Sequence, residues 1–130
     1  EVWRALHGAK PTGKLGLSRF IVIADTDQEA LNTARRAYPV WHTNFYYLAR
    51  LSGRMPAHPR SPEFDQMMEI GQAIAGTPET VRQFLQAQLD GSAANYLVGQ
   101  FAFGDLSLAE SLRTVGLFRR EVMPKLCGKD

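Results

Sequence analysis

The chain has 130 residues, 45% hydrophobic and 22% charged, a balance typical of one folded globular domain and unlike that of disordered proteins. Its 15 basic and 13 acidic residues leave a formal net charge of +2, which favours neither nucleic acid nor another strongly charged partner. The apolar runs fall short of the roughly 20 residues of a membrane span, no signal-peptide pattern opens the chain, and the single Cys127 excludes an internal disulfide, so we expect a cytoplasmic protein.

The first half of the chain predicts a strand followed by a long helix. Residues 1–14 join a short apolar stretch to a turn-rich segment, and we expect them to be a loop or flexible. Residues 20–24, "FIVIA", are rich in β-branched side chains and predict a strand. The following "TDQE" is a capping-box pattern that starts a helix, whose apolar residues recur at helical spacing as far as Leu48. We expect Pro39 to kink or divide this helix.

The middle of the chain predicts a loop and then two helices. Residues 52–62 hold three prolines among basic and small residues, which indicates a loop. Ser61 and Pro62 then predict a helix start, with an apolar face that runs from Phe64 to Ile74. Thr77, followed by proline, predicts the start of the next helix, which Gly91 would end.

The last part of the chain predicts a second strand and a closing helix. Residues 96–103, "YLVGQFAF", are apolar on both faces, which is typical of strands inside a parallel sheet covered by helices. "SLAE", from Ser107, is another capping box, and the amphipathic helix after it would bury a stripe that includes Leu108, Leu112 and Val115. Strands separated by helices predict an α/β fold with parallel pairing, and two strands need further strands to form a stable sheet.

Three stretches together, "RFIVIADTDQEA", "AGTPETVRQFL" and "QFAFGDLSLAESLRTVGLFRREVMPKL", resemble the C-terminal part of the luciferase-like flavin-dependent monooxygenases. The likeness covers most of residues 15–126. It implies that residues 1–130 are a single segment of a partial (β/α)8 TIM barrel, a fold that usually needs about 250 residues. The segment would hold the last β/α units, with residues 96–103 as the eighth strand.

The resemblance also implies a chemistry. Relatives use reduced FMN, or in some cases a deazaflavin, with O2 to oxygenate a small organic substrate. Most contacts to the flavin come from earlier strands that this chain lacks, so we expect the chain alone to be inactive. No catalytic residue can be assigned from it.

Barrel active sites lie at the carboxyl ends of the strands, which directs attention to two groups of residues. The end of the second strand would contribute cofactor contacts through Gln100, Phe101 and Phe103, or these side chains would be barrel core. The long helix and the loop after it would wall and cover a substrate channel through Trp41, Tyr46, Arg54 and His58, with Phe45, Tyr47 and Arg60 beside them. Alternatively, the aromatic residues form the buried stripe of the helix, and the loop is a solvent-exposed connection.

Other chemistries have weaker support in the sequence. "GTPET" would bind phosphate at a helix start or simply cap the helix. His7, His42 and His58 lack the spacing of metal ligands, so we expect no metal; His42 is the one candidate acid or base.

Two other functions remain open beside the monooxygenase. The first is a non-catalytic module that oligomerises through exposed strand edges, and the second is a small binding domain with a flavodoxin-like sheet. We expect a homo-oligomer. Its expected partners are a small-molecule substrate and O2, and we expect it to bind neither nucleic acid nor a membrane.

Overall fold

A parallel sheet of three strands organises the part of the chain that the computed structural model describes, which is Ala5 and residues 13–126. The strands are β1 (Gly16–Ile23), β2 (Ala73–Gly76) and β3 (Tyr96–Gln100), in the order β2-β1-β3. Phe20 of β1 pairs with Ala73 on one side and with Gln100 on the other. The predicted α/β class and the parallel pairing are confirmed. The expectations for residues 1–12, including His7, and for Cys127 lie outside the described residues.

Strand β2 is a correction, because the sequence pattern predicts a helix through Ile74. Helix α4 (Phe64–Glu69) ends early, and Gly71, with a φ of 72°, turns the chain into the strand in a conformation that side chains disfavour. All four residues of β2, "AIAG", are buried. This run is too short, and holds too few β-branched residues, for apolar spacing to separate strand from helix. Its pairing with β1 decides the outcome.

The predicted helix starts are mostly confirmed at atomic detail. Thr26 Oγ1 accepts a hydrogen bond from the amide of Glu29 at 3.1 Å and caps α2 (Asp27–Phe45). Thr77 caps α5 (Pro78–Gly91) in the same way, and Ser107 forms a complete capping box at α6 (Leu108–Leu117). The predicted start at Ser61 is wrong by two residues, since Ser61 accepts only from the Glu63 amide and Glu63 itself precedes α4.

Proline acts less strongly on the first helix than the sequence suggests. Helix α2 continues through Pro39, and the break comes at Tyr46, after which the short α3 (Tyr47–Leu51) and the loop of residues 52–63 follow. The loop prediction is confirmed. The closing helix changes form after α6 into a π-helical turn, η1 (Phe118–Val122), and a 3-10 turn, η2 (Met123–Lys125).

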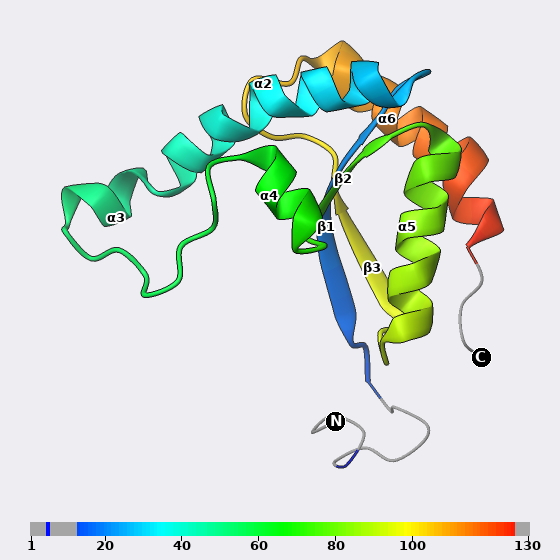
Figure 1. Ribbon diagram of the computed structural model, residues 1–130, viewed down its shortest axis with the longest axis horizontal. Coiled ribbons are helices and arrows are strands. Elements are labelled where there is room, and N and C mark those ends of the chain that lie inside the picture. The colour runs from blue at the N-terminus through cyan, green and yellow to red at the C-terminus, as the bar shows by residue number, and fades with distance from the viewer. Residues whose placement is uncertain (1–4, 6–12, 127–130) are drawn as a thin grey trace.

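Helices cover both faces of the sheet. Helix α2 packs on the face that presents Phe20 and Val22, and it lies across the end of the sheet where the strands finish (Figure 1). Helix α5 and turn η1 pack on the opposite face against Ile21 and Ile23. Alternate residues of β1 are therefore buried on both sides, as the apolar run predicts.

Strand β3 and helix α6 are less covered than the sequence predicts. The strand ends at Gln100 instead of Phe103, and its side chains Tyr96 and Val98 are 46% and 42% exposed. On α6 the expected buried stripe is wrong for its first three residues, since Leu108, Leu112 and Val115 are 75%, 60% and 41% exposed. Lys14 lies over the Tyr96 ring, 4.8 Å from its centroid, and the edge position of β3 in the described sheet leaves Tyr96 and Val98 partly exposed.

The strand order also differs from simple consecutive barrel units. Consecutive strands of a (β/α)8 barrel lie next to each other, whereas here β1 lies between β2 and β3. The three strands show a parallel α/β sheet and do not by themselves show a barrel. Within residues 13–126, no helix is long and apolar enough to cross a membrane.

Candidate functional site

Four aromatic rings meet at the middle of β1, level with the carboxyl end of β3, and form what we call the aromatic cluster: Phe20, Tyr38, Trp41 and Phe103. Phe20 of β1 lies at its centre, with ring centroids 4.7 Å from Trp41 and 5.1 Å from both Tyr38 and Phe103, all edge to face. This geometry places the positive edge of one ring on the negative face of another. The cluster joins β1, α2 and the segment after β3, three residues before β1 ends at Ile23.

The loop of residues 52–63 is fixed to this end of α2 at Arg60. The Arg60 amide donates to the Tyr46 hydroxyl at 2.8 Å, and Nε2 of His42 donates to the Arg60 carbonyl at 2.9 Å. The Arg60 guanidinium lies 5.8 Å from the ring centroids of both Trp41 and Phe45, within cation–π range. A long loop is thus anchored where its cation faces two aromatic rings.

The Tyr38 hydroxyl is buried inside the cluster without a hydrogen-bond partner among the described residues. Burial raises the pKa of Tyr38 to about 12, and the nearby charge of Arg60 opposes that rise. An orphaned buried hydroxyl is uncommon, because leaving it unpaired costs about 1–3 kcal/mol. It marks a polar position that a ligand or water would satisfy.

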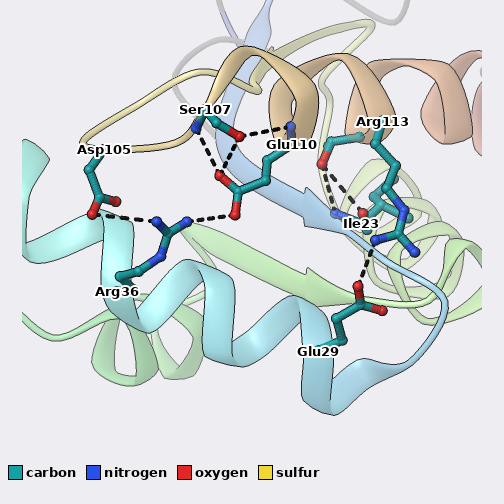
Figure 2. A network of polar contacts seen from close by, with 8 residues as sticks. Ile23, Glu29, Arg36, Asp105, Ser107, Glu110 and Arg113 are labelled. Carbon is teal, nitrogen blue, oxygen red and sulfur yellow. Dashed lines mark hydrogen bonds and ion pairs between the residues drawn. The ribbon is translucent and has the colours of Figure 1, made fainter.

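A polar network ties α6 to α2 beside the cluster (Figure 2). Arg36 of α2 contacts Glu110 at 2.7 Å and Asp105 at 3.6 Å. Glu110 also accepts from the Ser107 amide, and this hydrogen bond is the main cause that lowers the pKa of Glu110. These groups are partly exposed, so their stabilising effect is modest and they chiefly orient the two helices.

Further along α6, two residues bind the end of β1. Arg113 contacts Asp25 and Glu29, each at 2.6 Å. Thr114 is buried, and its hydroxyl accepts from the Ile23 amide at 3.3 Å and donates to the Ile23 carbonyl at 3.4 Å. No β3 residue pairs with Ile23, so Thr114 replaces the missing strand partner.

The start of α5 is already occupied by an internal anion. The Asp27 carboxylate accepts from the Thr77 amide at 2.7 Å, and this bond lowers the pKa of Asp27. The carboxylate lies where a phosphate would lie at a helix N-terminus. The "GTPET" stretch therefore acts as a helix cap that receives Asp27.

The structure brings some of the predicted site residues together and separates others. Phe103 and Trp41 both belong to the aromatic cluster, and Tyr46 is connected to it by the hydrogen bond that its hydroxyl accepts from the Arg60 amide. Phe101 packs on the opposite face of the sheet, 5.0 Å from the Phe118 ring, and so does not share a pocket with Phe103.

Of the other predicted residues, Gln100 pairs with Phe20 in the sheet, while Arg54 and His58 lie in the loop. Gln100 also donates to the Ser18 hydroxyl at 2.9 Å, and both loop residues are exposed. Sequence reasoning missed the central position of Phe20 and the orphaned hydroxyl of Tyr38. Their signals are weak: Phe20 opens an ordinary strand, and Tyr38 shares the helical spacing of Trp41 and Phe45.

A flavin would fit these residues only as one wall of a site. The rings of the cluster pack edge to face against one another, and Phe20 and Phe103 are buried, so no ring of a ligand fits between them. A pocket beside them, lined by Thr33, Arg113 and Thr114, has a volume of about 70 Å³, small against the roughly 300 Å³ of a minimal cofactor site. The open part is the side formed by Trp41, Phe45 and Arg60. Within the described ranges, no group of His, Cys, Asp or Glu side chains has the arrangement of a metal site.

Comparisons with known proteins agree with this picture of a partial fold. No protein-family model matches the chain. A curated relative, the uncharacterized protein y4wF of Sinorhizobium fredii, is 38% identical over 113 residues, which is 86% of this chain and 33% of the relative. The chain thus spans about a third of the relative's length.

Solved structures share the fold at low sequence identity. The monooxygenase RslO1 of Streptomyces bottropensis matches with a TM-score of 0.70 and 24% identity, over 95% of this chain and 34% of its own. The oxygenating constituent of 3,6-diketocamphane monooxygenase of Pseudomonas putida, a type II Baeyer-Villiger monooxygenase in complex with FMN, matches with a TM-score of 0.62 and 20% identity, over 88% and 34%. Apo-MsnO8 matches with a TM-score of 0.50 and 19% identity, over 92% and 37%. The structural neighbours of this chain are flavin-dependent monooxygenases of luciferase-like type, and the chain has the fold of about a third of such a protein.

Proposed function

We propose that this chain is the C-terminal part of a luciferase-like flavin-dependent monooxygenase, which in its complete form uses reduced FMN and O2 to oxygenate a small organic substrate. The observation that carries the proposal is the fold match over 95% of this chain to one third of a monooxygenase. An FMN-bound neighbour supports FMN as the cofactor. The aromatic cluster and Arg60, beside the carboxyl end of β3, are chemically suited to such a site.

In this proposal β1 and β3 are neighbouring strands of the complete barrel, and β2 is an added strand. Helix α5 and turn η1 would lie on the outer surface of the barrel. The unpaired edge of β3 and the exposed Leu108 and Leu112 of α6 would contact the rest of the barrel. Their exposure in this chain follows from the absence of that neighbour.

Bound reduced flavin would supply the electrons that activate O2, and this chain's residues would shape the space around it. Trp41 and Phe103 would form an apolar wall that excludes water from the reacting groups. Arg60 would place a positive charge at the rim. Gln100, Arg54 and His58 remain predicted contacts of the cofactor or substrate, and Phe101 would instead support the strand from behind.

The test compares the complete gene product with residues 1–130. We expect the complete protein to bind reduced FMN tightly under anaerobic conditions, and to consume O2 with substrate when a flavin reductase supplies reduced FMN. The isolated chain should bind reduced FMN at least tenfold more weakly, because it offers one wall. Equally tight binding by residues 1–130 would contradict the proposal, and tight binding of a deazaflavin but not FMN would correct the cofactor.

The alternative function is a non-catalytic module that forms homo-oligomers. The exposed Tyr96 and Val98 on β3, together with Leu108 and Leu112 on α6, are the observation that favours it, because exposed apolar edges promote association. A reading frame with about 200 further upstream residues, enough to complete a barrel, would support the enzyme. A reading frame without them, with a stable flavin-free oligomer in analytical ultracentrifugation, would support the module.

A further inference from the structure

Arg60 differs from the ion-paired arginines of this protein because it is fixed in place without an acidic partner among the described residues. Arg35, Arg36 and Arg113 each contact a carboxylate, at 2.9, 2.7 and 2.6 Å. For Arg60, the contacts are instead two backbone hydrogen bonds, to Tyr46 and His42, and two aromatic rings. The hydrogen bonds hold the Arg60 backbone, and the exposed guanidinium rests only against the two rings, so it remains available to an anion.

The surroundings of Arg60 are apolar on one side and open on the other. Trp41 and Phe45 are stacked, with centroids 4.7 Å apart and ring planes 20° apart, and 56% of Phe45 is exposed. This exposed ring offers a flat apolar surface beside the guanidinium. Tyr46, whose hydroxyl anchors the loop, is buried and gives the Arg60 backbone a fixed support.

A second, independent feature points to a ligand in the same region. The Tyr38 ring stacks on Trp41 with centroids 5.3 Å apart, and its hydroxyl is buried and orphaned within the described residues. Arg60 is close enough for its charge to act on that hydroxyl. A fixed unpaired cation, an exposed aromatic ring and an unpaired hydroxyl therefore belong to one small region of α2 and its loop.

We propose that Arg60, Trp41 and Phe45 bind an organic anion, with a carboxylate, sulfonate or phosphate group on Arg60 and a planar apolar body against the Phe45 ring. A guanidinium forms charge-assisted, two-point hydrogen bonds with such groups. A neutral ligand of the same shape gains only the apolar contact. The inference goes beyond the monooxygenase proposal, because it concerns binding by this chain without flavin and stands on the loop geometry alone.

The experiment measures binding of 2-naphthoate to residues 1–130 through tryptophan fluorescence. The chain has two tryptophans, Trp3 and Trp41, so a Trp3→Phe background leaves Trp41 as the reporter beside the proposed site. We expect saturable quenching by 2-naphthoate and at least tenfold weaker binding of the uncharged 2-naphthamide. In that background, Arg60→Gln should weaken naphthoate binding about tenfold, equivalent to about 1.4 kcal/mol, and should leave naphthamide binding unchanged.

The matched control is Arg119→Gln, which removes the same charge from an exposed position on turn η1. It should change the naphthoate dissociation constant less than twofold. Raising NaCl from about 0.05 M to about 0.5 M should weaken naphthoate binding and spare naphthamide, because salt screens exposed charges. This second measurement needs no substitution, so it holds even if the Arg60 variant fails to fold.

Three outcomes would overturn the inference: equal effects of Arg60→Gln and Arg119→Gln, equal affinity for the acid and the amide, or no saturable binding. None of them bears on reduced-flavin binding by the complete protein. A failure of the anion site and a failure of the monooxygenase proposal are therefore distinguishable.

Discussion

Replacing Gly104 by alanine should destabilise the protein more than any other single added methyl group near the site. Gly104 has a φ of 62°, a left-handed conformation that costs an alanine about 1–2 kcal/mol. A Cβ at this position would also lie 1.8 Å from the Ala37 carbonyl oxygen of α2, far inside van der Waals contact. Either the segment after β3 or helix α2 must move, which adds about 1–3 kcal/mol as in overpacked cores. The total is about 2–5 kcal/mol, a large share of a domain's stability.

The matched control is Gly53→Ala. Gly53 has nearly the same φ, 65°, but no atom within 4 Å of its added Cβ, so it isolates the conformational cost of about 1–2 kcal/mol. Urea unfolding of both variants, followed by far-ultraviolet circular dichroism, gives the two free energies of unfolding. Equal losses in both variants would refute the claim that close approach to α2 requires glycine at position 104.

Three further predictions test the polar groups around the site. Thr114→Val should lower the free energy of unfolding by about 1–3 kcal/mol, because the Ile23 amide and carbonyl lose their partner. Thr114→Ser keeps the hydroxyl and should lower the free energy of unfolding less. Equal losses for the two variants in urea unfolding would contradict this role of Thr114. Asp27→Asn should make the free energy of unfolding depend less on pH in acid. The lowered pKa of Asp27 means that its carboxylate stabilises the fold above the ordinary aspartate pKa of about 4, and this contribution disappears as the pH falls through the lower folded pKa. Identical acid unfolding curves for the variant and the wild type would count against the Thr77 contact. Tyr38→Phe should leave the free energy of unfolding unchanged or higher at pH 7, and should remove a tyrosine that ionises near pH 12. Because the folded pKa of Tyr38 is raised, the wild type should lose stability between about pH 10 and pH 12. Matching absorbance titrations of the two proteins at alkaline pH would exclude a buried Tyr38 hydroxyl.

The candidate site was only partly predictable, because its residues converge through tertiary packing. Trp41 and Phe45 are four residues apart on α2, so the helical spacing alone placed them on one face. Phe101 and Phe103 are two residues apart and would share a face in a continuous strand. The strand ends at Gln100, however, and the two rings lie on opposite faces of the sheet. No local pattern marks where a strand leaves its sheet.

The local sequence determined where α2, α5 and α6 begin, since Thr26, Thr77 and Ser107 each bind an amide three residues ahead. It also determined β1, whose apolar side chains require cover on both faces. Only the tertiary structure decided that residues 73–76 form a strand, that Thr114 binds Ile23 and that Arg60 faces Trp41. These contacts join residues between 19 and 91 positions apart in the chain, and their free energy depends on the packing of whole elements and not on the preference of any short stretch.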